Sequence, residues 1–278
     1  MVSASEASDT IARAMCGIAG YSVSPECALD RTLAAQALLA GIAERGADAV
    51  GYAYRTVRGS VCVRKQRSGA SQLLHQVAVP TTATQVLLHV RDYTKGHPSI
   101  EQNNHPIRHG RVVGVHNGII VNDDDLFARL AIERAHPAMT VDSEIIFALA
   151  ERSRGQTAPT LERLDGAMAT AWLDEERPEL ILARGTGRPL WLGLGRGAAF
   201  FASTCFALEL LERSLRLSLR KVELPTGTLL ALDEGDVAAR ERFRPDLSYR
   251  EPDPLPAVRA PEEGASCLAA LRAAAAAA

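Results

Sequence analysis

The order of strand-like segments along the chain is the feature that most constrains the fold. Residues 49–56 and 60–67 alternate apolar and polar side chains on either side of Gly59, as the arms of a hairpin do. Residues 84–92 are more continuously apolar, which is typical of a buried strand. Further short strands, separated by Gly and Pro, are expected at 167–174, 179–185, 189–195, 198–203, 215–224 and 227–233. Helices do not alternate regularly with these strands, so the pattern indicates an α+β layered fold.

Four helices are expected among these strands, at 27–46, about 122–134, 140–153 and 205–214. Gly46 is a natural stop for the first, and the third carries Asp142 in its first turn. The polar stretch 93–109 predicts a long ordered loop, which in a compact domain is often functional. The strand 110–120 is expected to end in a turn at Asn117-Gly118, because both residues tolerate positive φ.

Composition excludes several functional classes. The chain has 278 residues, 47% of them hydrophobic, and a formal net charge of -2, which gives no reason to expect nucleic acid as a partner. No apolar run approaches the ~18 residues that span a bilayer, so no membrane partner is expected. Glu6 and Asp9 are unsuited to a signal peptide, which points to the cytoplasm. Five cysteines without C-x-x-C spacing predict no disulfide framework, metal site or cofactor.

Three regions are expected from these patterns. Residues 1–15 read as a leader or propeptide, or as a mis-assigned start, since translation from Met15 would place Cys16 next. Residues 16–240 hold the expected helices and strands. Residues 241–278 read as a Pro- and Ala-rich tail, the last part of which could be helical because Ala is the best helix former.

Cys16 opens the strand "CGIAGYSV", and its residue type alone leaves two interpretations. A cysteine beside Gly and Ala in a strand is commonly a small buried hydrophobe. It becomes a nucleophile only with a base, which the histidines between His89 and His116 could supply. The α-amino group of an N-terminal Cys16 is a second candidate base, with a pKa near ~8.

A series of short motifs resembles one family. "MCGIAGY" at 15–21 is similar to the start of class II glutamine amidotransferase domains, which are N-terminal-nucleophile (Ntn) hydrolases whose mature chain begins C-G-I-x-G. Later segments resemble family motifs in the family's order, over about residues 16 to 235: "ERGADAVGY" at 44–52, "HVRDYTKG" at 89–96, "NNHPI" at 103–107, "VHNGII" at 115–120, "VDSEIIFAL" at 141–149, "ARGTGRPLWLG" at 183–193 and "FFAST" at 200–204.

The resemblance implies a four-layer αββα sandwich of two antiparallel sheets that hydrolyses the side-chain amide of L-glutamine. Cys16 would be the nucleophile and its freed α-amino group the base. Asn117, through its side-chain amide, and Gly118, through its backbone N–H, would form the oxyanion hole.

Four further residues would serve substrate binding in this resemblance. Arg91 would bind the α-carboxylate of glutamine, a contact that suits a planar guanidinium. Asp142 would hold the α-ammonium, kept ionised by the start of its helix. Thr94 and Arg45 would order the substrate loop. The chain departs from the family at Asp92, where the family has Trp, and at Lys95, where it has His.

The resemblance also bears on partners. Relatives pass ammonia to a fused synthase, and residues 241–278 are too few for one, so a separate synthase or acceptor subunit is expected. Two alternatives remain at the level of sequence. One is an amidase of the same type acting on another γ-glutamyl or related amide. The other is a catalytically silent regulatory subunit, because residues 1–15 as written would acylate the amine that must act as base.

Overall fold

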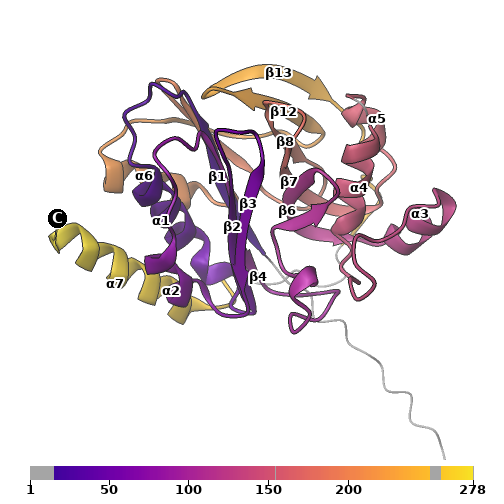
Figure 1. Cartoon of the computed structure of the whole chain (residues 1–278), viewed down its shortest axis with the longest axis horizontal. Helices are drawn as coiled ribbons and strands as arrows, with labels where there is room; N and C mark the ends of the chain where they lie inside the picture. The colour runs from indigo at the N-terminus through magenta and orange to yellow at the C-terminus, as the bar shows by residue number, and fades with distance from the viewer. Residues whose placement is uncertain (1–15, 154, 251–257, 278) are drawn as a thin grey trace, which may run out of the picture.

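Two antiparallel sheets face each other between two layers of helices in the computed structural model (Figure 1). The structure describes residues 16–153, 155–250 and 258–277, and the expected leader at 1–15 lies outside them. The sheets have strand orders β11-β9-β10-β1-β4-β2-β3 and β13-β12-β8-β7-β6-β5. The predicted α+β fold, a four-layer αββα sandwich, is confirmed.

The first sheet carries the N-terminal strand at its centre and is covered on its outer face by helices. Its strands are β1 (Gly17–Val23), β2 (Ala49–Arg55), β3 (Val61–Gln66), β4 (Gln85–Arg91), β9 (Trp191–Gly195), β10 (Ala198–Ala202) and β11 (Arg220–Glu223). The covering elements are α1 (Arg31–Ile42), the 3-10 turn η1 (Ala43–Arg45), α2 (Ala70–Leu73), η2 (Leu74–Gln76), α6 (Cys205–Leu215) and α7 (Pro261–Ala277).

The second sheet packs against the inner face of the first. Its strands are β5 (Ile107–His109), β6 (Val112–Ile120), β7 (Gly166–Asp174), β8 (Leu180–Arg184), β12 (Thr228–Asp233) and β13 (Asp236–Arg242). Its outer layer consists of α3 (Asp123–Arg129), α4 (Glu144–Arg152) and α5 (Thr157–Leu161), and the short turn η3 (Glu101–Asn103) lies in the loop after β4.

Burial of β1 on both faces explains why its sequence is so apolar. Ile18 belongs to the apolar cluster between the two sheets, whereas Ala19, Tyr21 and Val23 belong to the cluster between the first sheet and its helices. Successive side chains of a strand point to opposite faces, so an entirely buried central strand needs apolar residues at nearly every position. The start of this strand, where Cys16 lies, is thereby fixed by the core.

Two local expectations are wrong. Asn117 and Gly118 form no turn: they lie inside β6 and pair with Ala169 and Met168 of β7. Pairing along the whole of β7 outweighs their local preference for a turn. The helix expected at 122–134 is α3, which ends at Arg129.

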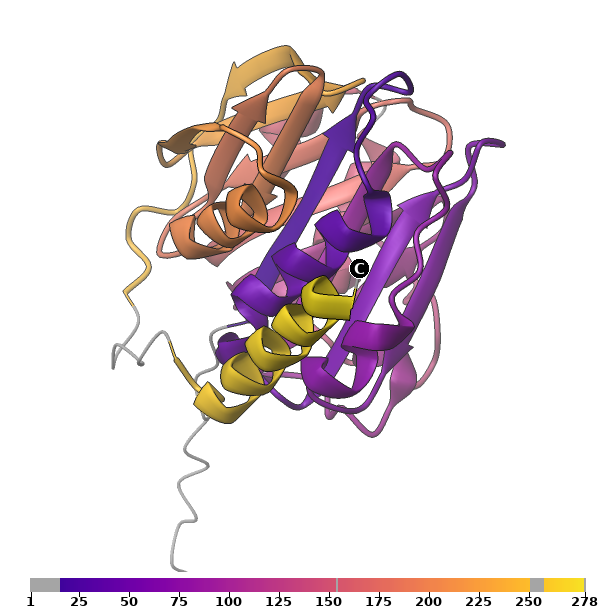
Figure 2. The same ribbon diagram turned by 90° about the vertical axis from the view of Figure 1, so that its left-hand side faces the viewer.

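Part of the expected Pro- and Ala-rich tail is a helix that packs on the rest of the fold. Residues 261–277 form α7, which lies beside α1 and α2 in the outer helical layer (Figure 2). Cys267 and Leu271 of this helix belong to the apolar cluster beneath that layer. Among the described residues, no helix is long and apolar enough to cross a membrane.

Candidate active site

Cys16 is held at the head of β1 by two hydrogen bonds from different loops. Its Sγ–H donates to the backbone carbonyl of Asp92 over 3.3 Å. Its own carbonyl oxygen accepts from Nε of Arg45 over 3.0 Å. Burial raises the pKa of the Cys16 thiol to about 11, although the positive charge of Arg91 opposes that rise. The thiol is therefore neutral near pH 7 and needs a base to become a nucleophile.

Arg45 lies on η1 and is almost completely buried. Its loop-ordering role stays a prediction from the sequence, and the structure adds a direct contact with the predicted nucleophile. Burial lowers the pKa of Arg45 to about 10, which leaves the guanidinium positively charged at neutral pH. A positive charge beside the Cys16 backbone favours the thiolate form of the cysteine.

Arg91 ends β4, the strand next to β1, and its guanidinium is buried beneath the loop that follows. Nη1 donates to Oδ1 of Asn104 over 2.6 Å, and Nη2 donates to the carbonyls of Lys95 and Gly96, the former over 2.8 Å. Burial lowers the pKa of Arg91. Every one of these acceptors is neutral, and within the described part of the chain no carboxylate forms an ion pair with Arg91.

The loop after β4 is tied down at both ends. Oδ1 of Asn103 accepts from the backbone N–H groups of Thr140 and Val141, over 2.8 and 3.1 Å, which joins the loop to the residues before Asp142. Lys95 forms ion pairs with Asp123 and Asp124 at the start of α3. Thr94 lies in this loop next to Lys95 and is half-buried.

Asp142 is buried, and its Oδ2 accepts from the backbone N–H of Ile120 over 2.7 Å. It precedes α4, whose N-cap is Ser143, so it is not inside the first helical turn as expected. Burial raises the pKa of Asp142 to about 6 despite the bond from Ile120 and the nearby positive charges of Lys95 and Arg91. With a pKa of about 6 the carboxylate is ionised at neutral pH, and desolvation by burial is the largest influence on that pKa.

Asn117 and Gly118 reach the site from the second sheet. Nδ2 of Asn117 lies 3.5 Å from Oγ of Ser203, and that hydroxyl accepts from the backbone N–H of Ile18 over 3.0 Å. Ser203 thus joins Asn117 to the strand that begins after Cys16. Oδ1 of Asn117 has no hydrogen-bond partner among the described residues. At Gly118, φ is +149°, and an added Cβ would overlap the carbonyl oxygen of Ala167.

The buried histidines do not serve as partners of the thiol. Nε2 of His89 binds the carbonyl of His116 over 3.0 Å, and the His89 ring stacks on His105 with centroids 4.1 Å apart. Burial lowers the pKa of both His89 and His116 to about 3, so both rings are neutral and weakly basic. Of the two bases that the sequence left open, the histidines are therefore disfavoured, and the α-amino group of Cys16 stays a prediction.

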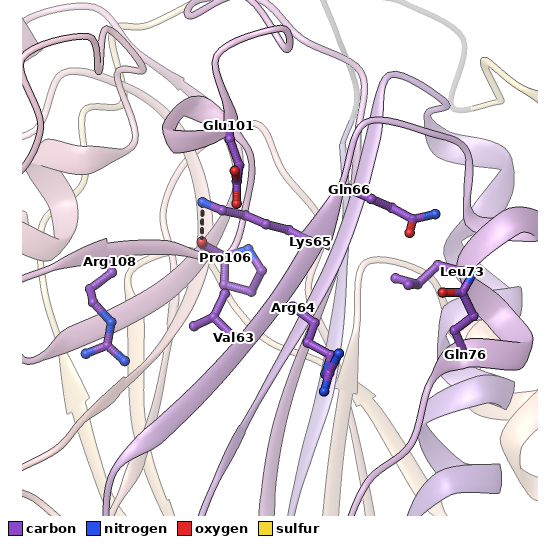
Figure 3. Close-up of a pocket in the computed structure, with 9 residues that line it drawn as sticks. All are labelled: Val63, Arg64, Lys65, Gln66, Leu73, Gln76, Glu101, Pro106 and Arg108. Atoms are coloured by element: carbon purple, nitrogen blue, oxygen red, sulfur yellow. Dashed lines mark hydrogen bonds between the residues drawn. The ribbon is translucent and has the colours of Figure 1, made fainter.

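A separate cavity of about 480 Å³ lies beside the edge strand β3 (Figure 3). None of the predicted site residues lines it. Lys65 points from this cavity toward the Pro106 carbonyl and also donates to the carbonyl of Asn104 over 2.8 Å. Burial lowers the pKa of Lys65 to about 8. The cavity therefore adjoins the loop that binds Arg91 without being part of the predicted site.

Asn104 and Ser203 are the site residues to which the sequence assigned no role. Both lie in quoted motifs, "NNHPI" and "FFAST", so the motifs themselves were the available signal. The structure shows their partners: Asn104 binds Arg91, and Ser203 binds Ile18 and Asn117. Among the described residues, no group of three or more His, Cys, Asp or Glu side chains is placed to hold a metal ion.

Two facing antiparallel sheets between helical layers, with a cysteine at the head of a central strand, define the architecture of the Ntn hydrolases. Comparisons with known proteins identify a family within this class. Residues 89–210 match the family described as glutamine amidotransferase domain. The matched residues are thus a glutamine amidotransferase domain, and the relatives that resemble the chain are class II amidotransferases.

The similar curated proteins are much longer than this chain. It is 35% identical over 228 residues to glutamine–fructose-6-phosphate aminotransferase (isomerizing) of Caulobacter vibrioides, covering 79% of this chain and 36% of that protein. It is 33% identical over 237 residues to the enzyme of the same name from Escherichia coli K12, covering 81% of this chain and 35% of that one. The chain thus spans about a third of the length of these relatives.

The fold is shared with a solved amidotransferase. Glutamine phosphoribosylpyrophosphate amidotransferase from B. subtilis, in complex with ADP and GMP, matches with a TM-score of 0.65 and 21% identity. The match covers 82% of this chain and 49% of that one. At this level of identity, the likeness establishes the fold alone.

Proposed function

We propose that residues 16–240 form a domain that hydrolyses the side-chain amide of L-glutamine, with Cys16 as the nucleophile once it is the N-terminal residue. One observation carries the proposal: Arg91 and Asp142 are both buried, carry opposite charges and form no ion pair within the described residues. A buried charge that has no opposite charge in direct contact is unfavourable, and these two groups attract each other only at longer range. The α-carboxylate and α-ammonium of a free amino acid would supply a direct partner for each.

The covalent chemistry follows from the state of Cys16. With its pKa raised to about 11, the thiol must lose its proton as it attacks, and the α-amino group of the same residue would be the base. Sγ would bond to the amide carbon, and the proton would pass through the amine to the departing ammonia. Water would then cleave the γ-glutamyl thioester, which releases glutamate and restores the thiol.

The oxyanion of the tetrahedral intermediate would be bound by Nδ2 of Asn117 and the backbone N–H of Gly118. Nδ2 makes only a long contact of 3.5 Å to Ser203, so a stronger acceptor would readily replace that contact. Thr94 and Arg45 would act at the edges of the site, Thr94 in the loop over the substrate and Arg45 on the Cys16 carbonyl.

The ammonia acceptor is proposed to lie on a separate synthase subunit. The relatives named above carry the aminotransferase activity in one chain about three times as long as the matched part. A cytoplasmic location stays a prediction from the sequence.

Glutaminase activity of the purified full chain tests the proposal. Intact mass establishes whether the chain begins at Cys16, and glutamate release is then measured with Cys16→Ala and Cys205→Ala as a matched pair. Activity should vanish in Cys16→Ala and persist in Cys205→Ala, because Cys205 lies on α6, outside the proposed site. A chain that begins at Cys16 and releases no glutamate would overturn the proposal.

Glutamine with its α-carboxylate blocked as an amide tests the role of Arg91. The blocked compound should not be hydrolysed, because it offers no negative charge to the buried guanidinium. Equal turnover of both compounds would instead indicate an amidase for other γ-glutamyl or related amides.

A further inference from the structure

The C-terminal segment that contains Val258–Ala277 contacts both loops that hold Cys16. The backbone N–H groups of Arg259 and Ala260 both donate to the carbonyl of Glu44, over 2.8 and 2.9 Å. The Arg259 side chain also binds Asp92, with Nε 3.0 Å from Oδ2. Two consecutive residues therefore join η1 to the loop after β4.

Each of these contacts lies next to a group that touches the nucleophile. Glu44 is followed in the chain by Arg45, whose Nε donates to the Cys16 carbonyl. Asp92 uses its side chain for Arg259 and its backbone carbonyl for the Sγ–H of Cys16. The thiol of Cys16 is thus linked to the C-terminal segment through one residue, Asp92, and its main chain through two, Glu44 and Arg45.

The segment is itself firmly anchored. Oε2 of Glu263 accepts from the backbone N–H of Ser71 over 2.8 Å. Cys267 and Leu271 are buried in the apolar cluster beneath the helical layer, where α7 lies beside α1 and α2 (Figure 2). At Gly264 the helix approaches Glu44 so closely that an added Cβ would lie 3.0 Å from the Glu44 Cβ.

The ion pair involves Asp92, one of the residues at which the chain departs from the resembled motif. Its partner Arg259 lies beyond residues 89–210, which match the family. The side chain of Arg259 is 33% exposed and that of Asp92 18%, so the pair contributes modestly to the free energy of unfolding. Because the pair joins the C-terminal segment to the loop after β4, it is better placed to orient that loop than to stabilise the whole fold.

We propose that Arg259 is a positioning residue for Cys16, which acts through Asp92 to hold the thiol at the head of β1. The effect on turnover rests on the proposed glutaminase function, whereas the effect on the thiol itself does not. Loss of the Arg259 side chain should loosen the Asp92 carbonyl. The thiol then becomes easier for a small reagent to reach and less well placed for attack on a bound amide.

Alkylation of the full chain with iodoacetamide, followed by peptide mass spectrometry, measures the thiol directly. In Arg259→Ala, Cys16 should react about fivefold faster than in the wild type, the factor expected for loss of a partly exposed ion pair. Arg259→Lys should restore most of the protection. Arg244→Ala is the matched control, because Arg244 pairs with Glu162 near α5 in the opposite helical layer, and it should react like the wild type.

Cys267 provides an internal control in the same experiment, since it is buried in α7 and has no part in the proposed chemistry. Its alkylation should not change in Arg259→Ala. A parallel rise at Cys16 and Cys267 would mean that α7 undocks as a whole, and this would overturn the positioning role. Unchanged alkylation of Cys16 would overturn it as well.

Glutamine kinetics separate the inference from the function on which it partly rests. Arg259→Ala should lower kcat about fivefold without changing KM, because the nucleophile moves while the groups that bind glutamine stay in place. An unchanged kcat in an active enzyme counts against the role of Arg259. If the wild-type chain with a free Cys16 hydrolyses no glutamine, the proposed function fails, and the alkylation result alone decides the inference.

Discussion

Oδ1 of Asn104 lies 2.6 Å from Nη1 of Arg91, and both side chains are buried. Asn104 is fixed in turn, because its Nδ2 donates to the Pro98 carbonyl over 2.8 Å and its own carbonyl accepts from Lys65. The direction of the guanidinium, and with it the proposed place of the glutamine α-carboxylate, therefore depends on an amide in the loop after β4.

Asn104→Ala should raise KM for glutamine about tenfold, the scale expected when a hydrogen bond to a charged group is lost. Because Asn104 contacts neither Cys16 nor Asn117, kcat should stay close to the wild-type value. Steady-state kinetics measure both constants. Gln76→Ala, which removes an exposed amide from η2, serves as the control, and a fall in kcat with KM unchanged would contradict the assignment.

Asn117→Ala should lower kcat about 10²–10³-fold, the usual cost of losing an oxyanion donor. Its effect on the Tm should be small, because Nδ2 makes one 3.5 Å contact and Oδ1 has no partner among the described residues. Kinetics and thermal unfolding of the same preparation distinguish the two effects. A large drop in Tm would assign Asn117 a structural role in place of the oxyanion role.

Gly118→Ala should destabilise the fold by about 3 kcal/mol, from backbone strain together with the overlap at the Ala167 carbonyl. Gly59→Ala is the matched control, because its φ is also positive, at +85°, but the nearest atom to an added Cβ is 3.8 Å away. That variant should lose only about 1 kcal/mol. Urea denaturation measures both, and equal losses would show that the overlap is relieved.

The layers of the fold were predictable because both sheets bury apolar residues at nearly every position of their central strands, as β1 does. The turn at Asn117-Gly118 was predicted wrongly, since pairing with β7 is a long-range property that local preference does not contain. The raised pKa of Asp142 depends on burial by distant segments. The pair of Asp92 and Arg259 joins positions 167 residues apart, and nothing in the local sequence indicates it.

The pH dependence of glutamine binding should follow Asp142. The pKa of this carboxyl is raised to about 6, so it is ionised above that pH and protonated below it. A neutral Asp142 attracts the α-ammonium of glutamine less, so kcat/KM should fall as the pH drops through 6. Asp142→Asn should have a low kcat/KM at neutral pH and lose this limb of the profile. If the limb persists in the variant, another group is responsible.

Lys95 is expected to fix the loop after β4 to the start of α3 through its ion pairs. Nζ lies 2.7 Å from Oδ2 of Asp123 and 2.8 Å from Oδ2 of Asp124, and the Lys95 carbonyl accepts from Arg91. Lys95→Ala should therefore raise KM for glutamine about fivefold and lower the free energy of unfolding by about 1 kcal/mol, because Asp123 keeps its ion pair with Arg134.

The dependence of KM on salt concentration tests the ion pairs of Lys95 more directly. Lys95 is 34% exposed, so added salt should weaken its ion pairs and raise KM in the wild type, whereas KM of Lys95→Ala should respond much less. Arg129→Ala is the matched control, since it removes an exposed pair with Asp125 on α3 that does not touch the loop. Its KM should follow the wild-type curve. A salt response that is the same in all three proteins would show that Lys95 does not control the loop.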